Sequence, residues 1–254
     1  MANIAFIFTG QGAQYVGMGK QISQEYRSAD YIFNQASEAL GFDVKAMVFE
    51  GDDETLKITE NTQPAILTTS IACLQPLLEK GIKPDVVAGL SLGEYSAHVA
   101  AGTISFKDAV ALVRKRGKYM QEAVPLGVGT MAAILGLDNE SVIECCKNAS
   151  SEGIVEPANF NCPGQVVVAG EVKAVEKVVE LTKEKGAKRL MVLPVSAPFH
   201  CSMLKPAGEK LAAELENIEI NDMKIPVVTN VTGEYIIDKS RVKELLIKQV
   251  SSPV

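Results

Sequence analysis

The chain has 254 residues, a formal net charge of −6, and 47% hydrophobic and 22% charged residues. These are ordinary globular values, and they exclude a disordered chain. The acidic balance argues against a general nucleic-acid binder, which presents a basic face and a high pI. With no apolar run of about 18 residues, the sequence predicts no membrane span.

The N-terminus and the cysteines indicate a reducing compartment. Residues 1–8 have no basic start, and their apolar run is too short for a signal peptide. The five cysteines form no CxxC pair and no metal-ligand spacing, and His98 and His200 are the only histidines. We therefore expect reduced thiols in a cytoplasmic protein, without a disulfide framework or a metal site.

The first half of the chain alternates strands with helices. Residues 4–8 form a predicted buried strand, which runs into a glycine-rich loop at 9–14 and then into a helix. A second short strand at 84–88 precedes a nearly all-apolar helix that ends at Gly102. This alternation predicts an α/β domain with a mainly parallel sheet.

The order of predicted strands and helices changes between Pro125 and Pro194. The order β-α-β-β-α-β is the ferredoxin-like pattern, and we expect a small domain of this kind at 126–193. It is inserted into an α/β core of 1–125 and 194–254. The predicted elements are strand 130–135, helix 138–149, strands 154–160 and 165–169, helix 172–185, strand 187–193, and in the tail strand 225–230 and helix 241–250.

Ser91 is the first candidate for catalysis. Its G-x-S-x-G string at 89–93 is weak evidence alone, but it follows a predicted strand and opens a predicted helix, as in a nucleophile elbow. At a helix N-terminus, the dipole and the free N–H groups favour a developing oxyanion. The plainer alternative is an N-cap serine in a glycine-rich turn; the strand–turn–helix context favours the nucleophile.

A serine nucleophile needs a base, and the two histidines compete for that role. His98 lies seven residues after Ser91 on the same predicted helix. That spacing is roughly 10 Å along the axis, too far for a hydrogen bond. His200 follows an irregular segment just after the predicted insert, so by elimination it is the predicted base. The adjacent Cys201 is interpreted as incidental.

Arg116 is the third candidate. The predicted helix at 107–122 carries one apolar stripe at the 3.6-residue period, and Arg116 falls inside that stripe. An inward arginine is rarely buried without an anionic partner. On composition alone the better prediction is a structural salt bridge with a core carboxylate. The sharper hypothesis is a substrate carboxylate held by both arms of the guanidinium.

The loop at 10–15 begins like a dinucleotide fingerprint. It has Tyr15 where the third glycine belongs, and it lacks the lysine of a phosphate loop. Nucleotide binding is therefore not expected. A glycine-rich loop at the end of a strand can instead offer a backbone N–H to an oxyanion.

Five motifs occur together in one order and spacing. They are residues 8–14, 89–95, 116–117 and 198–200, and Gln249. In this combination they resemble a known family, the malonyl-CoA:acyl-carrier-protein transacylases of type II fatty acid synthesis, which is related to the acyltransferase domains of polyketide synthases. The resemblance covers the whole chain and implies a hydrolase-like α/β core with a ferredoxin-like insert.

The resemblance implies a reaction that moves a malonyl group from malonyl-CoA to the phosphopantetheine thiol of acyl carrier protein. It implies a malonyl-serine intermediate and no cofactor, and we expect a monomer. The implied site residues are the nucleophile Ser91, the general base His200, the oxyanion-hole N–H groups of Gln11 and Leu92, the malonyl-binding Arg116, and Gln249, which orients His200.

Two features depart from the family pattern. The family commonly has histidine directly before the nucleophile, where this chain has Leu90. We expect a packing change with little loss of catalysis, because that position points away from Ser91. The family also continues past Val254, so the core is expected to lack its C-terminal end, close to Gln249.

Other functions stay open at this stage. A serine hydrolase would use an acid such as Asp138 or Glu156 in the order Ser…acid…His. An acyltransferase that supplies a polyketide synthase would use the same chemistry as the transacylase. A non-catalytic binding module is disfavoured because Ser91, Arg116 and His200 are all present.

Two basic runs are candidate docking patches for anionic partners. They lie at 114–118 and 183–189. CoA carries phosphates and the carrier proteins of the family are acidic, so local basic patches would attract both. A solvated helix face is an equally good interpretation of each run.

Overall fold

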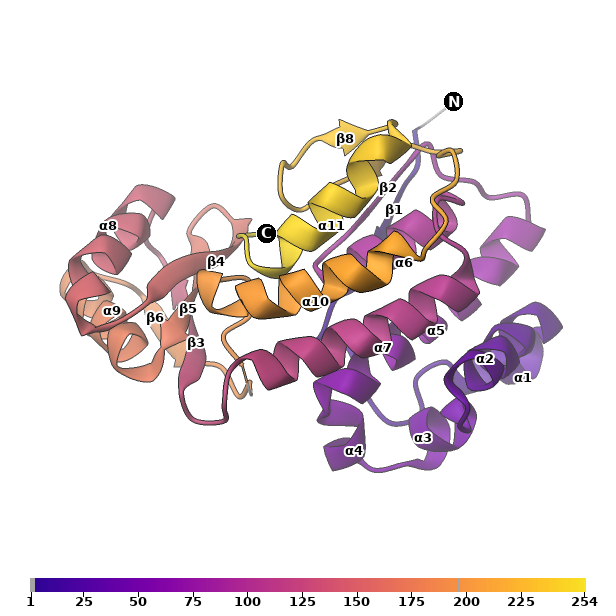
Figure 1. The fold of residues 1–254 in the computed structure, drawn as a ribbon, viewed down its shortest axis with the longest axis horizontal. Helices are drawn as coiled ribbons and strands as arrows, with labels where there is room; N and C mark the ends of the chain where they lie inside the picture. Colours follow the sequence, from indigo (N-terminus) through magenta and orange to yellow (C-terminus); the bar gives the residue numbers. More distant parts are fainter. Residues whose placement is uncertain (1–2, 196) are drawn as a thin grey trace. The chain divides into compact units, whose positions relative to one another are not determined.

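The computed structural model describes residues 3–195 and 197–254. The chain divides into two compact units. The first contains Met1–Lys118 and Ala213–Lys243, and the second contains Tyr119–Ala212 and Glu244–Val254. The polypeptide passes from one unit to the other within the helices α7 (Phe106–Ala123), α10 (Lys205–Glu216) and α11 (Val242–Val250) (Figure 1).

The first unit is built on a four-stranded sheet in the order β1-β2-β7-β8. The strands β1 (Ala5–Phe8), β2 (Val86–Gly89) and β7 (Val227–Val228) are parallel, and β8 (Tyr235–Ile236) joins antiparallel. The predicted α/β class with a mainly parallel sheet is therefore confirmed. The tail strand is shorter than the expected 225–230, since β7 begins only after Pro226, which has no N–H to donate.

Five helices separate β1 from β2, where the sequence predicted one. Asp43 and Asp52 cap two of the short ones by accepting hydrogen bonds from the first-turn amides. The longest is mostly buried although it contains Pro64 and Pro76. The helices are α1 (Lys20–Glu25), α2 (Arg27–Leu40), α3 (Val44–Glu50), α4 (Asp53–Lys57) and α5 (Thr59–Glu79).

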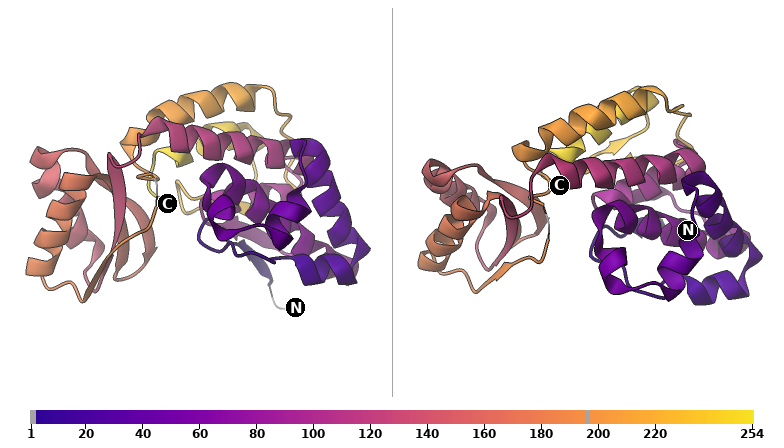
Figure 2. Two further views of the ribbon diagram at one scale, coloured as in Figure 1. Left: turned by 90° about the horizontal axis from the view of Figure 1, so that it is seen from below. Right: turned by 60° about the horizontal axis from the view of Figure 1, so that its bottom comes forward.

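The second unit contains a fully antiparallel sheet in the order β4-β5-β3-β6. Figure 2 shows α8 and α9 on one face of this sheet, and small apolar side chains fill the layer between them. Every element predicted between 126 and 193 is confirmed to within two residues or so at each end. These elements are β3 (Gly129–Leu135), α8 (Asn139–Ala149), β4 (Val155–Cys162), β5 (Gln165–Glu171), α9 (Val172–Glu184) and β6 (Arg189–Val192).

Helix α6 (Leu92–Ala100) follows β2 and buries His98 in the first unit. The imidazole is 1% exposed, and neither ring nitrogen has a hydrogen-bond partner among the described residues. Its nearest acid is Glu94, whose Oε1 lies 3.9 Å from Nε2. Burial lowers the pKa of His98 to about 4, so the ring is neutral at pH 7.

The free energy of unfolding should therefore fall in mild acid. The unfolded chain protonates His98 below about pH 6.5, whereas the folded chain does so only near pH 4. Stability is lost as the pH falls through this window, by about 2 kcal/mol between pH 7.5 and pH 5. Replacing His98 with Leu removes this proton uptake and the two unpartnered nitrogens, so the variant should match or exceed the parent at pH 7.5 and exceed it clearly at pH 5.

Urea unfolding of parent and variant at both pH values measures the difference. An equal loss of stability on acidification in parent and variant would show that His98 does not titrate in this way.

Candidate active site

Ser91 lies in a strained turn between β2 and α6. Its φ of 51° and ψ of −105° are sparsely populated for a residue with a side chain. The flanking glycines allow close packing: a Cβ on Gly89 would lie 2.0 Å from the Gly93 carbonyl carbon, and one on Gly93 would lie 2.3 Å from the Phe8 carbonyl oxygen. Ser91 stands at the N-cap position of α6, but its hydroxyl makes no capping hydrogen bond to this helix. The predicted strand–turn–helix arrangement is present.

Arg116 points from α7 into the interior and is 1% exposed, as its place in the apolar stripe predicts. Its Nη2 donates a hydrogen bond to Ser91 Oγ at 3.1 Å, and Nη1 donates to Gln63 Oε1 at 2.8 Å. The guanidinium also lies over the ring of Tyr95, with Cζ 5.3 Å from the ring centroid. These contacts direct a cation at the candidate nucleophile.

The charge on Arg116 is partly balanced from within the first unit. Burial lowers the pKa of its guanidinium, and Tyr95 and Glu94 oppose that shift. Burial also raises the pKa of Tyr95 to about 12, so the phenol stays neutral. An arginine keeps its proton under these conditions, so a buried cation lies beside Ser91.

The loop after β1 packs directly against the turn that holds Ser91. A Cβ on Gly10 would lie 2.5 Å from the Leu90 carbonyl oxygen. The amide N–H groups of Gln11 and Leu92 take part in no hydrogen bond within the part of the chain that the structure describes. The side chain of Leu90 is 45% exposed, so it fills no core position. Two open amide donors thus belong to segments in contact, which is the arrangement an oxyanion hole needs.

His200 lies in the second unit, buried at 4% exposure, with a positive φ of 60°. Its Nδ1 is 2.8 Å from the backbone carbonyl oxygen of Gln249. A carbonyl only accepts hydrogen bonds, so Nδ1 carries the proton of the neutral ring and Nε2 is the basic nitrogen. The contact predicted with Gln249 is present, and it comes from the main chain.

The acids considered for a triad are engaged elsewhere. Both carboxylate oxygens of Glu156 accept hydrogen bonds from Ser202, from its N–H and its hydroxyl, at 2.7 Å each. Asp138 caps α8 by accepting from the Ser141 amide at 2.7 Å. Burial raises the pKa of Cys201 to about 12, which keeps its thiol protonated and unreactive.

The structure places the predicted site residues in two sets. Ser91 and Arg116 meet in the first unit, which also holds Gln11 and Leu92. His200 and Gln249 meet in the second.

Sequence reasoning missed three polar residues that contact the first set. Gln63 binds Arg116, and Asn230 binds the Ser91 amide. The carboxylate of Glu94 accepts a hydrogen bond from the backbone N–H of Asn230. A lone acid in a nearly all-apolar helix was a usable signal for Glu94, whereas Asn230 comes from far along the chain and has none.

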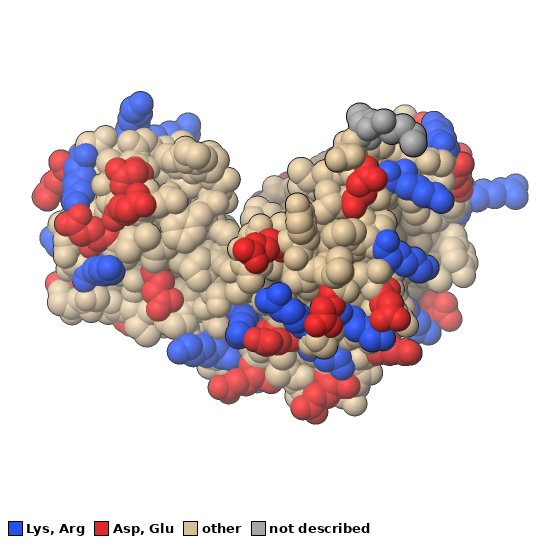
Figure 3. Space-filling view, turned by 90° about the horizontal axis from the view of Figure 1, so that it is seen from above, with Lys and Arg blue, Asp and Glu red and all other residues tan. Residues whose placement is uncertain are grey.

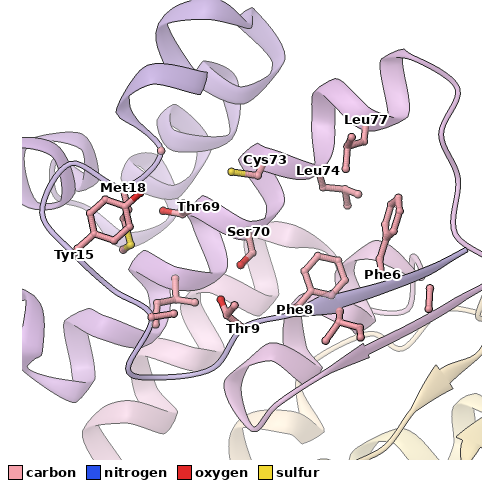
Figure 4. A pocket seen from close by; sticks show the side chains of 15 residues that line it. Phe6, Phe8, Thr9, Tyr15, Met18, Thr69, Ser70, Cys73, Leu74 and Leu77 are labelled. Carbon is pink, nitrogen blue, oxygen red and sulfur yellow. The ribbon is translucent and has the colours of Figure 1, made fainter.

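A pocket in the first unit lies apart from this chemistry. Figure 4 shows a pocket of about 410 Å³ lined by Phe6 and Phe8 of β1 and by Cys73, Leu74 and Leu77 of α5. Its lining is mostly apolar and includes none of the predicted site residues.

Among the described residues, no group of three or more His, Cys, Asp or Glu is placed to hold a metal ion. No helix within residues 3–195 and 197–254 has the length and apolar character needed to cross a membrane.

Comparisons with known proteins show the family to which the chain belongs. Residues 5–254 match the family model described as "Acyl transferase domain". The chain is 51% identical over 255 residues to the malonyl CoA-acyl carrier protein transacylase of Bacillus subtilis (strain 168), covering 100% of this chain and 80% of that protein. It is 48% identical to the transacylase of Escherichia coli (strain K12), covering 100% of this chain and 82% of that protein.

Two solved structures are equally similar in fold. The malonyl CoA-acyl carrier protein transacylase from Clostridium perfringens matches with a TM-score of 0.97 and 50% identity, covering 100% of this chain and 80% of that one. A malonyl-transacylase in complex with a type II PKS acyl-carrier protein matches with a TM-score of 0.97 and 46% identity, covering 100% and 82%. The chain therefore belongs to the acyl transferase domain family and, within it, to the malonyl CoA-acyl carrier protein transacylases.

Proposed function

We propose that the chain transfers a malonyl group from malonyl-CoA to the phosphopantetheine thiol of acyl carrier protein. The observation that carries this proposal is the buried guanidinium of Arg116, whose Nη2 lies 3.1 Å from Ser91 Oγ. A cation held beside a nucleophile selects an acyl group that ends in a carboxylate. The relatives named as malonyl CoA-acyl carrier protein transacylases support the same substrate pair.

The reaction proceeds in two half-steps. Ser91 Oγ attacks the thioester carbonyl carbon of malonyl-CoA while His200 Nε2 takes the hydroxyl proton, and the C–S bond then breaks. CoA thiolate leaves with the proton returned by His200. The carrier thiol next loses its proton to His200 and attacks the malonyl-serine ester. The C–O bond to Ser91 breaks, His200 returns the proton to Oγ, and the malonyl thioester of the carrier protein leaves. Ping-pong kinetics follow from this sequence.

The amides of Gln11 and Leu92 are the proposed donors to the tetrahedral oxyanion in both half-steps. Arg116 takes the malonyl carboxylate, which then replaces Ser91 as a partner of the guanidinium and leaves Oγ ready to attack. Gln249 orients His200 through its carbonyl, the role that an aspartate has in a triad. No cofactor takes part in this scheme.

The hydrolase alternative finds no support in the second unit. Its triad would require an acid at Nδ1 of His200, and that nitrogen is bonded to the Gln249 carbonyl. The supply of a polyketide synthase uses the same chemistry, and one similar structure is a complex with a type II PKS acyl-carrier protein. The carrier protein alone distinguishes the two pathways.

We also infer that the segment 126–193 is a ferredoxin-like insert in a hydrolase-like core. The supporting observations are the β-α-β-β-α-β element order and the antiparallel order β4-β5-β3-β6.

A cytoplasmic location and a monomeric state remain our expectations for the working enzyme. Its five cysteines are free thiols.

The anionic partners favour the second basic run as a docking patch. In the first run, Arg114 pairs with Glu60 and Lys115 with Glu214, and Arg116 is buried. In the second run, Lys185 pairs with Glu144, while the exposed Lys183, Lys188 and Arg189 form no ion pair among the described residues. On the face drawn in Figure 3, acidic and basic side chains are interspersed, so local sets of cations decide the attraction.

The first test is covalent labelling of Ser91. Intact-mass analysis after mixing with malonyl-CoA should show a stable malonyl adduct, whereas acetyl-CoA should give little or none, because acetyl leaves the buried guanidinium without its carboxylate. Peptide mapping then locates the adduct on Ser91. The absence of any adduct, or equal adducts from both thioesters, would refute the proposed selectivity.

Replacing Arg116 with Ala tests the residue directly. The rate constant kcat/KM for malonyl-CoA should fall on the order of 100-fold or more, because a buried charged contact is lost. The preference should shift toward uncharged acyl groups. Replacing the exposed Arg241 of the same unit with Ala serves as the matched control and should leave both values unchanged. If selectivity survives in the Arg116 variant, the arginine is only a structural ion pair.

The protonation of His200 provides an independent test. Nitrogen NMR of histidine-labelled protein above the ring pKa should show His200 as the Nδ1–H tautomer with an unprotonated Nε2, since Nδ1 faces the Gln249 carbonyl. The His98→Leu variant leaves a single histidine and so fixes the assignment. A dominant Nε2–H tautomer would contradict the role of His200 as base through Nε2.

A further inference from the structure

Asn230 connects the two sides of the turn that holds Ser91. It follows β7 in the first unit, far from Ser91 in sequence. Its Oδ1 accepts a hydrogen bond from the Ser91 amide at 2.5 Å, and its Nδ2 donates to the Gly89 carbonyl at 2.7 Å. One side chain therefore binds the last residue of β2 and the candidate nucleophile together.

This contact fits the chemistry of an amide side chain. Ser91 offers a donor and Gly89 offers an acceptor, and only a carboxamide supplies an acceptor and a donor on one rigid fork. An aspartate at 230 would keep the acceptor, but it would place a second carboxylate oxygen against the Gly89 carbonyl. The turn needs such a contact, because a backbone in this region costs of order 1–3 kcal/mol and persists only when its surroundings fix it.

Glu94 fixes Asn230 in turn. Glu94 lies in the first turn of α6, and its carboxylate is fully buried. It accepts a hydrogen bond from the backbone N–H of Asn230 at 2.9 Å. The helix that begins just after Ser91 thus holds the residue that holds Ser91. A closed loop of contacts runs from Ser91 to Asn230, from Asn230 to Glu94, and back along α6.

We propose that Asn230 is a positioning residue for the nucleophile. It holds Ser91 in the strained conformation that sets the direction of Oγ, and it occupies the Ser91 amide, so that the Leu92 amide remains the donor available to the oxyanion. This assignment rests on the proposed acyl transfer through Ser91. Asn230 acts through the turn and need not touch the substrate.

The test compares Asn230→Ala and Asn230→Asp with the parent. As a matched control we choose Asn221→Ala, at an exposed asparagine of the same unit that binds the Thr103 carbonyl through its backbone N–H. Single-turnover acylation by malonyl-CoA should slow by about 100-fold in both Asn230 variants, the size expected for a reacting atom displaced by about 1 Å. In Asn230→Ala the KM for malonyl-CoA should stay within about twofold of the parent, because Arg116 is untouched.

A fluorophosphonate provides a second readout, because it labels an active serine without a thioester or a malonyl carboxylate. Its rate constant for Ser91 should fall by a similar factor in the variants and stay unchanged in Asn221→Ala. Urea unfolding reports the folded fraction of each protein, and Asn230→Asp, which keeps the shape of the side chain, decides the matter where Asn230→Ala does not fold.

The outcomes separate this inference from the proposed function. If the parent forms no malonyl adduct but reacts with the fluorophosphonate, the malonyl proposal fails, and Asn230 is still tested by the fluorophosphonate rates. If a folded Asn230 variant labels at the parental rate, the positioning role is refuted. It is refuted equally if the loss of rate is no larger than the loss of folded protein.

Discussion

The tight turn from β2 into α6 is the constraint on which the candidate site depends. Parallel pairing of β1 with β2 brings the loop after β1 and the turn after β2 to the same edge of the sheet. There is no room for side chains where they meet, since a Cβ on Gly10 or on Gly93 would strike a backbone carbonyl oxygen. This packing places Ser91 at the start of a helix. It also leaves the backbone N–H groups of Gln11 and Leu92, on the two segments in contact, available to donate hydrogen bonds.

The second constraint is electrostatic. A guanidinium at 1% exposure is tolerated only with partners, and the partners of Arg116 include neutral groups. Gln63 and Ser91 accept hydrogen bonds from the guanidinium, Tyr95 offers it a ring face, and the charge of Glu94 favours its protonated form. These contacts stabilise the buried guanidinium. They also leave it next to Ser91, where it can bind the carboxylate of an acyl group. The same argument is the basis of the proposed preference for acyl groups that end in a carboxylate.

Much of this was predictable because the signals are local. The 3.6-residue stripe of α7 placed Arg116 inside, and the turn residues around Ser91 marked the change from strand to helix. The element order between 126 and 193 followed from short apolar runs separated by caps and turns. Two features were not predicted. The long buried helix α5 contains Pro64 and Pro76, which are atypical inside a helix. The hydrogen bond between Asn230 and the Ser91 backbone N–H depends on the order of the strands in the sheet, which a local stretch of sequence does not reveal.

A neutral partner at His200 fits a thioester better than an amide. In a triad the aspartate stabilises the imidazolium that forms while a poor leaving group waits for its proton. The Gln249 carbonyl fixes the ring and its tautomer but offers only a dipole to that cation. A thiol has a pKa of about 8.5, so a thiolate leaves with little help from a general acid. In the proposed mechanism a base held by a carbonyl is then sufficient for the first half-step. In the second half-step the leaving group is Ser91 Oγ, and the imidazolium, which a carbonyl stabilises less than a carboxylate would, readily gives it the proton taken from the carrier thiol.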